Sequence, residues 1–339
     1  MWQMKIDYNH MKHVCVIGAT GYIGSKLALH LANEGYCVHA LYRDENKGAK
    51  LKHQNIKLVH GSLDDKMALE KAMYLCDGVF HTAAYTQPWS KDPKIYYTTN
   101  VTGTIHVIAA AKAAKVRRCV FTSTAGVFGP SASGIINEDH SSTHPFFSHY
   151  ETSKHEADRI ILNDQSGIEM IIVHPTRVIG PGLMSHSNGV TRLIQMYLKG
   201  QWHIIPGDGK ASGNYVFVED VVRGHLLAYK HGRDKERYIL GGENICYNAF
   251  FKELKRQSEC SYFLVKVPIF VMLIIAAMMQ FFARVCSTQP LVSMGFVRKF
   301  YSNWKVTSDK AIEELGYTPI SFRKSLSITI QWLREQYLV

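Results

Sequence analysis

Residues 13–24 read His-Val-Cys-Val-Ile-Gly-Ala-Thr-Gly-Tyr-Ile-Gly, and this stretch decides the class of fold. The apolar run His13–Ile17 predicts a buried strand that ends at Gly18. Residues 21–34 follow with apolar side chains at the period of an amphipathic helix, which Gly35 ends. The stretch therefore predicts a strand, a glycine-rich turn and a helix in direct succession.

The turn itself has the pattern G-x-x-G-x-x-G, and each glycine has a predicted use. Gly18 permits the tight turn, Gly21 lets the backbone approach a pyrophosphate, and Gly24 allows close packing of helix on strand. The start of the helix offers free N–H groups and a partial positive charge to phosphates. A structural βα turn is the alternative interpretation. We expect a dinucleotide to contact the whole turn, at Gly18, Thr20, Gly21, Tyr22, Ile23 and Gly24.

The following residues repeat the alternation of strand and helix. Apolar, strand-like runs are residues 36–42, 56–60, 78–84, 118–123 and 169–174, and helical stretches between them include residues 64–73, 96–115 and 150–163. Continuous apolar strands that alternate with helices predict a parallel sheet covered on both faces. The predicted fold class is α/β, a doubly wound parallel sheet (Rossmann fold).

The second half of the chain shows a looser, mixed pattern. We expect a disordered extension at residues 1–10, a dinucleotide-binding Rossmann domain at 11–180 and a substrate-binding region at 181–339. That last region is predicted to be a smaller mixed α/β domain, with some strands and helices returning to the Rossmann domain.

Composition narrows the class of protein further. The 339 residues are 46% hydrophobic and 20% charged, which excludes a disordered chain. The seven cysteines are scattered and form no C-x-x-C pair, so we expect reduced thiols and a cytoplasmic protein. The net charge of +11 is spread along the chain without a basic block, which argues against nucleic-acid binding. The 17 histidines lack zinc-site spacing, so we expect surface or loop histidines and no metal.

One segment, residues 267–283, is uncharged over 17 positions. A bilayer-spanning helix needs about 20 apolar residues, with roughly 17 as the lower limit. We expect helical turns buried in the substrate-binding region, or a hydrophobic lid over an apolar pocket. Peripheral contact with a membrane and a true span are the alternatives.

Residue Arg43 bears on the choice of nucleotide. It follows Gly24 by nineteen positions, near the place where an acidic residue binds the ribose hydroxyl of NAD and an arginine accommodates the 2′-phosphate of NADP. A guanidinium pairs well with phosphate. Asp44, the next residue, is counter-evidence that keeps NAD open. We predict NADP as the cofactor.

A tyrosine and a lysine lie one helical turn apart at Tyr150 and Lys154. A phenol with a pKa near 10 is a poor acid–base catalyst at neutral pH, and an ammonium nearby lowers that pKa. The run Thr122-Ser123-Thr124 ends a predicted strand and brings hydroxyls to the edge of the sheet where ligands bind. An ordinary exposed helical pair is the alternative for Tyr150 and Lys154.

Together these motifs resemble the extended short-chain dehydrogenase/reductase family, in which epimerases and dehydratases also occur. The resemblance covers nearly the whole chain from Met11 onward. It rests on the glycine turn, residues 81–84 (His-Thr-Ala-Ala), Asn100, the hydroxyl strand, the Tyr150 and Lys154 pair, and Pro175, in the family's order.

The resemblance implies a catalytic set of Thr124, Tyr150 and Lys154, assisted by Asn100. In the reducing direction Tyr150 would protonate a carbonyl oxygen, Thr124 would hydrogen-bond it, and Lys154 would hold the nicotinamide ribose. Further implied cofactor contacts are Lys50, Ser62, Leu63, Thr82, Ala83, Ala84, Thr122, Pro175 and Thr176, besides Tyr150 and Lys154. Dimerisation through the helices at 96–115 and 150–163 is implied by analogy only.

Two departures separate the chain from the nucleotide-sugar branch of that family. The first is in residues 174–182, which include Arg177 but lack the Asn that holds a nucleotide diphosphate in that branch. The second is Gly213, which stands where that branch usually has an Arg. The sequence is more similar to dihydroflavonol-4-reductases and 3β-hydroxysteroid dehydrogenases. Aromatic and apolar residues flank the catalytic stretches and are candidates for the substrate pocket: Tyr85, Trp89, Phe128, Phe146, Phe147 and Leu183.

The expected function is therefore an NADP(H)-dependent oxidoreductase that reduces a ketone, or oxidises a secondary alcohol, of a hydrophobic small molecule. The first alternative is a nucleotide-sugar epimerase or dehydratase with tightly bound NAD(P). The second is a non-catalytic, cofactor-sensing binding protein, which would not need a general acid.

Overall fold

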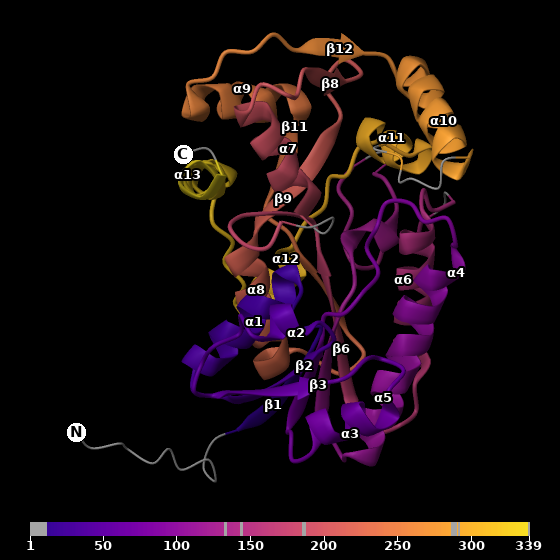
Figure 1. Ribbon diagram of the computed structural model, residues 1–339, viewed down its shortest axis with the longest axis vertical. Coiled ribbons are helices and arrows are strands. Elements are labelled where there is room, and N and C mark those ends of the chain that lie inside the picture. The colour runs from indigo at the N-terminus through magenta and orange to yellow at the C-terminus, as the bar shows by residue number, and fades with distance from the viewer. Residues whose placement is uncertain are drawn as a thin grey trace, which may run out of the picture.

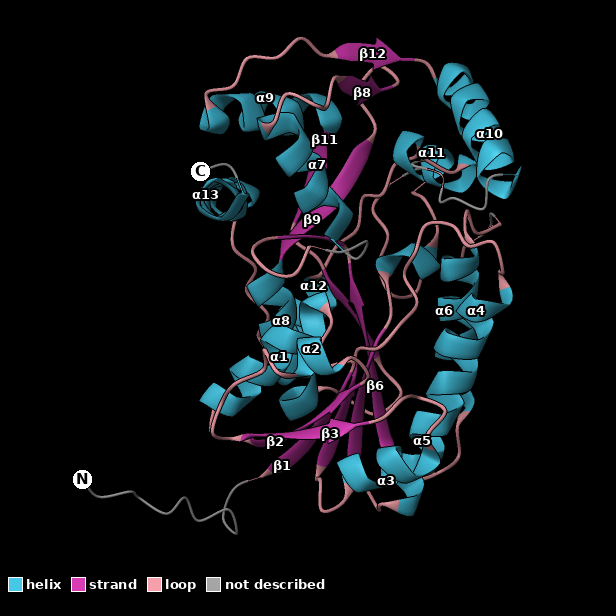
Figure 2. Ribbon diagram, viewed as in Figure 1, coloured by secondary structure: helices cyan, strands magenta, loops and turns pink. Residues whose placement is uncertain are grey.

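A parallel sheet of seven strands forms the centre of the molecule (Figures 1 and 2). The computed structural model describes residues 12–131, 134–142, 145–184, 188–285, 290 and 292–337, so the predicted extension at residues 1–10 lies outside it. The strand order is β10-β6-β5-β4-β1-β2-β3. The bounds are β1 (His13–Ile17), β2 (Cys37–Tyr42), β3 (Ile56–His60), β4 (Gly78–His81), β5 (Arg118–Thr122), β6 (Glu169–Pro175) and β10 (Arg237–Leu240).

Helices cover both faces of this sheet because successive strand residues point to opposite sides. On β1, Val14 and Val16 pack toward α1 and α8, whereas Cys15 and Ile17 pack toward α3 and α5. The confirmed class is the predicted doubly wound α/β fold. The helices around the sheet are α1 (Tyr22–Asn33), α2 (Glu45–Gly48), α3 (Lys66–Met73), α4 (Lys94–Tyr97), α5 (Gly103–Ala113), α6 (His149–Asn163), α8 (Val218–His231) and α12 (Asp309–Leu315).

A second group of elements lies beyond the carboxyl edge of the sheet (Figure 2). Its three-stranded sheet has the order β11-β9-β7, and β12 pairs with β8. The core of this group is apolar and aromatic, with Tyr197, Phe250 and Leu326 fully buried. The bounds are β7 (Arg177–Ile179), α7 (Gly189–Leu198), β8 (Ile204–Pro206), β9 (Ser212–Phe217), β11 (Glu243–Cys246), α9 (Tyr247–Ser258), β12 (Val265–Val267), α10 (Ile269–Val285), α11 (Met294–Tyr301) and α13 (Phe322–Tyr337).

The helix predicted over residues 96–115 is interrupted. Between α4 and α5 the chain forms a wider π-helical turn, Thr98–Thr102, which contains Asn100. Such a turn inserts an extra residue into a helix and is frequent at functional sites. It turns the buried Asn100 side chain toward the backbone of Tyr85.

The uncharged segment 267–283 is not buried, which contradicts the first expectation for it. It forms one helix, α10, at the edge of the molecule above α4 and α6 (Figure 1). Its Phe270, Ile274 and Phe281 side chains are 62%, 60% and 63% exposed. Among the described residues, no helix is long and apolar enough to cross a bilayer.

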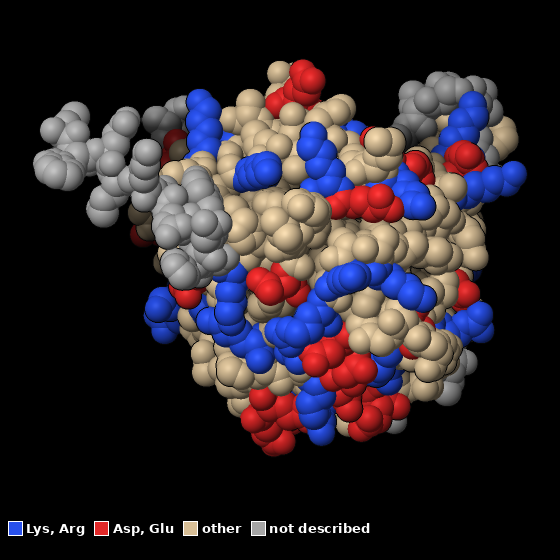
Figure 3. Space-filling view, turned by 90° about the horizontal axis from the view of Figure 1, so that it is seen from below, with Lys and Arg blue, Asp and Glu red and all other residues tan. Residues whose placement is uncertain are grey.

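Charged side chains of both signs are interspersed on the face of the molecule shown in Figure 3. Elsewhere in the described chain, ion pairs join such side chains, for example Lys310 with Glu236 at 2.5 Å and Arg117 with Glu169 at 3.2 Å. Exposed pairs of this kind contribute about 0–1 kcal/mol each. We therefore expect them to shape the surface potential more than the stability of the fold.

Candidate active site

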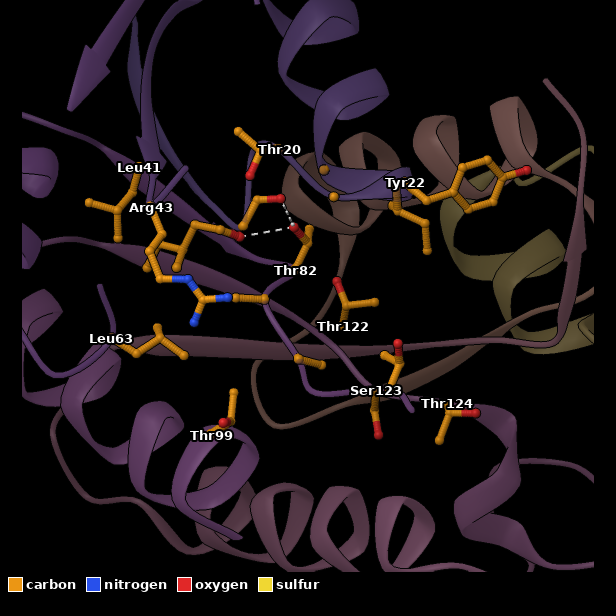
Figure 4. A pocket seen from close by; sticks show the side chains of 18 of the residues that line it. Thr20, Tyr22, Leu41, Arg43, Leu63, Thr82, Thr99, Thr122, Ser123 and Thr124 are labelled. Atoms are coloured by element: carbon orange, nitrogen blue, oxygen red, sulfur yellow. Dashed lines mark hydrogen bonds between the residues drawn. The ribbon is translucent and has the colours of Figure 1, made fainter. Parts of the chain in front are cut away.

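A cleft of about 530 Å³ opens at the carboxyl ends of the central strands (Figure 4). This edge of a doubly wound sheet is the general position of ligand sites. Most residues predicted from the sequence line it: Gly18, Thr20, Gly21, Tyr22, Ile23, Gly24, Arg43, Ser62, Leu63, Thr82, Ala83, Ala84, Thr122, Thr124, Tyr150, Pro175 and Thr176. Three predicted residues, Lys50, Asn100 and Lys154, are not among its lining.

The turn between β1 and α1 is packed so closely that no residue with a side chain fits at Gly18 or Gly24. Gly18 has a φ of +82°, and a Cβ there would lie 2.6 Å from the backbone N of Ala83. A Cβ on Gly24 would lie 2.1 Å from the Gly18 carbonyl oxygen and 2.6 Å from Thr82 Oγ1. Both distances are impossible for a real side chain, so only glycine lets helix, turn and β4 meet here.

A dinucleotide fits this cradle chemically. Gly21 caps α1 without a side-chain hydrogen bond, so the N–H groups of the first turn keep donor capacity for phosphate oxygens. The Thr82 hydroxyl donates to the Ile17 carbonyl at 2.9 Å and thus ties β4 to the turn (Figure 4). Tyr22 lines the cleft but its phenol points away and donates to the Gly180 carbonyl at 3.0 Å.

Two cations from the region after β2 line the cleft, Arg43 and Lys47. Asp44 instead caps α2, where its carboxylate accepts the backbone N–H of Lys47 at 3.2 Å. Lys50, predicted as a cofactor contact, does not line the cleft. The single turn of α2 brings Lys47 to the cleft and leaves Lys50 exposed beyond it.

Beyond β3, Ser62 and Leu63 line the cleft as predicted, and so does Asp64, which the sequence analysis did not single out. The Ser62 hydroxyl accepts the N–H of Asp64 at 3.3 Å, so the two side chains share one turn. The signal was present in the sequence, because Asp64 stands two positions after the predicted contact Ser62.

The three hydroxyls after β5 have different partners. Thr122 Oγ1 donates to His225 Nε2 at 2.8 Å, because His225 donates its Nδ1–H to the Val221 carbonyl and burial lowers its pKa to about 4. Ser123 Oγ donates to Asp158 Oδ2 at 2.8 Å. Thr124 Oγ1 accepts the N–H of Gly126 at 3.2 Å, and among the three it is the hydroxyl that influences the pKa of Tyr150.

Tyr150 stands in the first turn of α6. Ser148 starts this helix, and its hydroxyl accepts the N–H of Glu151 at 3.3 Å. Burial raises the pKa of Tyr150, the carboxylates of Glu151 and Asp158 raise it further, and the bond to Thr124 opposes them. The protein's own groups thus raise this pKa where we expected Lys154 to lower it, because desolvation and two carboxylates dominate.

Lys154 lies one turn further along α6 and is 3% exposed. Burial lowers the pKa of its ammonium, and Asp158 opposes that shift. In the described part of the chain this ammonium forms no hydrogen bond or ion pair. It therefore keeps its donors for a group that enters the cleft.

A buried network that the sequence analysis missed lies behind these residues. Asp158 Oδ2 accepts from Ser123 and contacts His174 Nε2 at 2.9 Å. Asp158 follows Lys154 by four positions, so the helical period that paired Tyr150 with Lys154 also pointed to it. The network fixes α6 against β5 and β6.

Asn100 does not line the cleft and is connected to Tyr150 through hydrogen bonds. Its Oδ1 accepts the N–H of Tyr85 at 2.7 Å, and its Nδ2 donates to Ser153 Oγ at 2.9 Å. Ser153 in turn donates to the Tyr150 carbonyl at 2.8 Å. The geometry makes Asn100 a positioning residue for α6.

Of the six residues proposed for the substrate pocket, Leu183 lines this cleft. Four others pack on aromatic neighbours: Tyr85 on Tyr96, Phe128 beside His174, Phe146 on His155 and Phe147 on Trp304. Phe128 is 1% exposed, and for the remaining residues a place in the substrate pocket stays a prediction. Aromatic side chains in loops supply core contacts as readily as pocket walls, which sequence position does not distinguish.

The two departures noted in the sequence prove to be one structural feature. Arg177 is half-buried among the rings of Tyr215, Tyr247 and Phe300, with its Cζ 5.2–5.6 Å from their centroids. A Cβ on Gly213 would lie 2.4 Å from its Nη1. The glycine therefore makes room for the guanidinium.

A cluster with metal-ligating groups lies at the opposite ends of the strands. Ligand atoms of His13, Cys37 and His39 lie within 4.8 Å of one another. His39 Nδ1 contacts the Ala72 carbonyl at 2.9 Å, and its Nε2 lies 3.4 Å from His13 Nδ1. The set could hold a divalent ion, and His13 is a strand residue, not the surface or loop residue expected. It takes no part in the cleft.

Comparison with known proteins places these features in a family. The model of the NAD dependent epimerase/dehydratase family matches residues 14–241. A putative dihydroflavonol 4-reductase of Synechocystis sp. is 30% identical over 94% of each chain. Sterol demethylase protein B of Methylococcus capsulatus is 28% identical over 96% of this chain and 99% of its own.

A solved structure has the same fold over nearly its whole length. The crystal structure of gox2253 superposes with a TM-score of 0.80 and 28% identity, over 96% of this chain and 99% of its own. The chain belongs to the NAD dependent epimerase/dehydratase family, as an NAD(P)-dependent oxidoreductase of the extended short-chain dehydrogenase/reductase type.

Proposed function

We propose that the protein is an NADP(H)-dependent oxidoreductase that interconverts a ketone and a secondary alcohol on a hydrophobic small molecule. The observation that carries this proposal is that Thr124 and Tyr150 line the same cleft as the glycine turn. A protein that only sensed a nucleotide would not need a proton donor at this position.

A bound nicotinamide cofactor supplies or accepts the hydride in such a reaction. Tyr150 holds a proton on its phenol oxygen, since burial and two carboxylates raise its pKa, and can pass that proton to a developing alkoxide. Thr124 orients the oxygen of the substrate. The ammonium of Lys154, buried and without a carboxylate partner in contact, is left to bind and to stabilise negative charge.

The preference for NADP rests on the charges that face the nucleotide end of the cleft. Arg43 and Lys47 line it and suit a 2′-phosphate. Asp44 is engaged as the cap of α2, which leaves it poorly placed as the ribose ligand of NAD. The six described cysteines are free thiols, which supports a reducing compartment such as the cytoplasm.

The preference for a ketone over a nucleotide sugar rests on Arg177 and Gly213. The residues that hold a nucleotide diphosphate in the sugar branch are replaced, and the guanidinium is enclosed by Tyr215, Tyr247 and Phe300. The relatives named above include a putative dihydroflavonol 4-reductase and a sterol demethylase protein, whose names point to apolar ring compounds.

The test is Tyr150→Phe, assayed against a panel of flavonoid, steroid and nucleotide-sugar substrates. General acid–base catalysis contributes about 10²- to 10⁴-fold, so we expect a loss of turnover of that order. NADPH affinity, measured by fluorescence, should stay within about threefold, since the phenol is not a phosphate contact. Near-normal turnover of the variant would remove Tyr150 from the mechanism, and activity on nucleotide sugars alone would favour the epimerase alternative.

A further inference from the structure

Helix α10 presents an apolar face to solvent along its whole length. The most exposed side chains follow the helical period at positions 270, 274, 278, 281 and 282: Phe270 62%, Ile274 60%, Met278 56%, Phe281 63% and Phe282 57%. The face carries no charged residue. Soluble monomeric proteins rarely expose a continuous apolar patch of this kind without a partner for it.

The orientation of this face is fixed by contacts on the other side of the helix. Ala276 and Ala283 are 0% and 2% exposed. Gln280 Oε1 accepts the N–H of Met294 at 3.2 Å, so α10 is held on the start of α11. The exposed face is therefore a property of the folded chain.

The stretch of chain that carries α10 is basic. Residues 260–308 contain no Asp or Glu. Of the cations in this stretch, Lys299 is paired with Glu151. Lys266 and Arg298 are exposed, and Lys266 stands just before α10. An apolar face flanked by cations is complementary to an anionic lipid surface.

The dimensions agree with a helix that lies in the plane of the membrane. Seventeen residues make a helix about 25 Å long. Two further exposed apolar side chains, Phe263 at 80% and Val265 at 45%, precede it in the chain beside β12. We propose that α10 docks the protein on anionic bilayers, with its exposed face buried at the boundary of headgroups and acyl chains.

The exposed face of α10 is connected to the helix that carries Tyr150, which suggests what docking on a membrane would achieve. Ser293 Oγ donates to the Pro88 carbonyl at 3.4 Å, and Lys299 pairs with Glu151 at 2.7 Å, next to Tyr150. Resting on the proposed function, this places the catalytic helix beside the lipid surface, where a hydrophobic ketone is concentrated. Substrate would then be taken from the membrane.

The experiment measures sedimentation of the full-length protein with vesicles, without cofactor or substrate. We expect binding to vesicles of equimolar phosphatidylcholine and phosphatidylglycerol, weaker binding to phosphatidylcholine alone, and a decrease with salt. The double variant Ile274→Glu, Met278→Glu places two carboxylates on the exposed face and should lower binding about tenfold or more. The matched control is Met67→Glu, at a residue of α3 that is 82% exposed, and it should bind like wild type.

Two outcomes overturn the proposal. One is equal binding of wild type and double variant to the mixed vesicles. The other is a dimer in light scattering that the double variant converts to a monomer without any vesicle binding, which assigns the face to a second copy of the chain. Turnover of a water-soluble ketone, measured separately, must be unchanged in the double variant, so failure of docking and failure of the proposed oxidoreductase function give different results.

Discussion

One wall of the cleft consists mainly of backbone atoms and the other mainly of side chains. The wall formed by β1, α1 and β4 is backbone: Gly18 and Gly24 bring main-chain atoms so close that no Cβ fits between them. The wall formed by the region after β5 and by α6 is side chain, chiefly Thr124 and Tyr150. Behind it, Ser123 and Asp158 form a buried hydrogen-bonded network.

This difference teaches where specificity can change. A wall of backbone tolerates almost no substitution but recognises only what every dinucleotide shares, its phosphates. A wall of side chains can be replaced residue by residue while α6 stays in place. The Arg177 and Gly213 pair, which differs from the sugar-binding branch, lies outside both walls, on β7 and β9.

The largest effect is expected where the backbone wall is broken. In Gly24→Ala the new Cβ would lie 2.1 Å from the Gly18 carbonyl oxygen, so the turn must move. We expect NADPH binding to weaken by about 100-fold or more, equivalent to roughly 3 kcal/mol. The control Gly189→Ala, with nothing within 4 Å of its Cβ, should bind normally. Comparable NADPH affinities in the two variants would contradict the cradle.

A smaller effect is expected from Arg43, which we propose to bind the 2′-phosphate. Arg43→Ala removes a charge-assisted contact worth about 1.5–3 kcal/mol, so NADP should weaken roughly 10- to 150-fold and NAD little. The dissociation constants of both nucleotides are compared at one salt concentration. Lys50→Ala, outside the cleft, should change neither. A selective loss of NAD in Asp44→Ala would reverse the assignment.

Outside the two walls, Gly213→Ala should destabilise the fold through its contact with Arg177. Its Cβ would meet the guanidinium at 2.4 Å, and overpacking of this kind costs about 1–3 kcal/mol. Urea unfolding gives the change in free energy of unfolding. In the Arg177→Ala background the same substitution should cost less, since the obstacle is gone. Equal costs in both backgrounds would mean that the two positions do not share space.

The smallest effect concerns the proton on Tyr150. The Glu151 carboxylate raises the pKa of that phenol, so Glu151→Gln should lower it, and Lys299 then lacks its partner and shifts it in the same direction. Reduction needs the protonated phenol, so activity should decline at lower pH on the alkaline side of the profile. The pH dependence of kcat/KM measures this. A shift to higher pH would contradict the assignment of Tyr150 as proton donor.

The sheet could be predicted from the sequence because its strands are buried on both faces. Such strands are short apolar runs with sharp ends, and His13–Ile17 has the same bounds in sequence and structure. The interruption at Thr98–Thr102 could not be predicted, since it serves the contact between Asn100 and Tyr85, which are neighbours only in the fold. Nor could the exposure of α10, because an apolar segment does not reveal what covers it.

In the candidate site the glycine turn and the pair Thr124 and Tyr150 could be predicted, whereas the packing of neighbouring side chains could not. Close approach of backbones leaves glycines in the sequence, as at Gly18 and Gly24. Lys47 and Lys50 are three residues apart in one short helix, and only the fold shows which of them faces the cleft. Phe128 resembled a pocket residue by its place in the chain, and packing decided otherwise.

The ion pair between Lys299 and Glu151 joins α11, which holds the proposed lipid-facing helix, to the residue beside Tyr150. If docking on a bilayer alters this pair, the proton affinity of Tyr150 and the affinity for the bilayer become linked quantities. Linkage is reciprocal, so the factor by which a bound bilayer changes the proton affinity is also the factor by which loss of the proton changes the affinity for the bilayer.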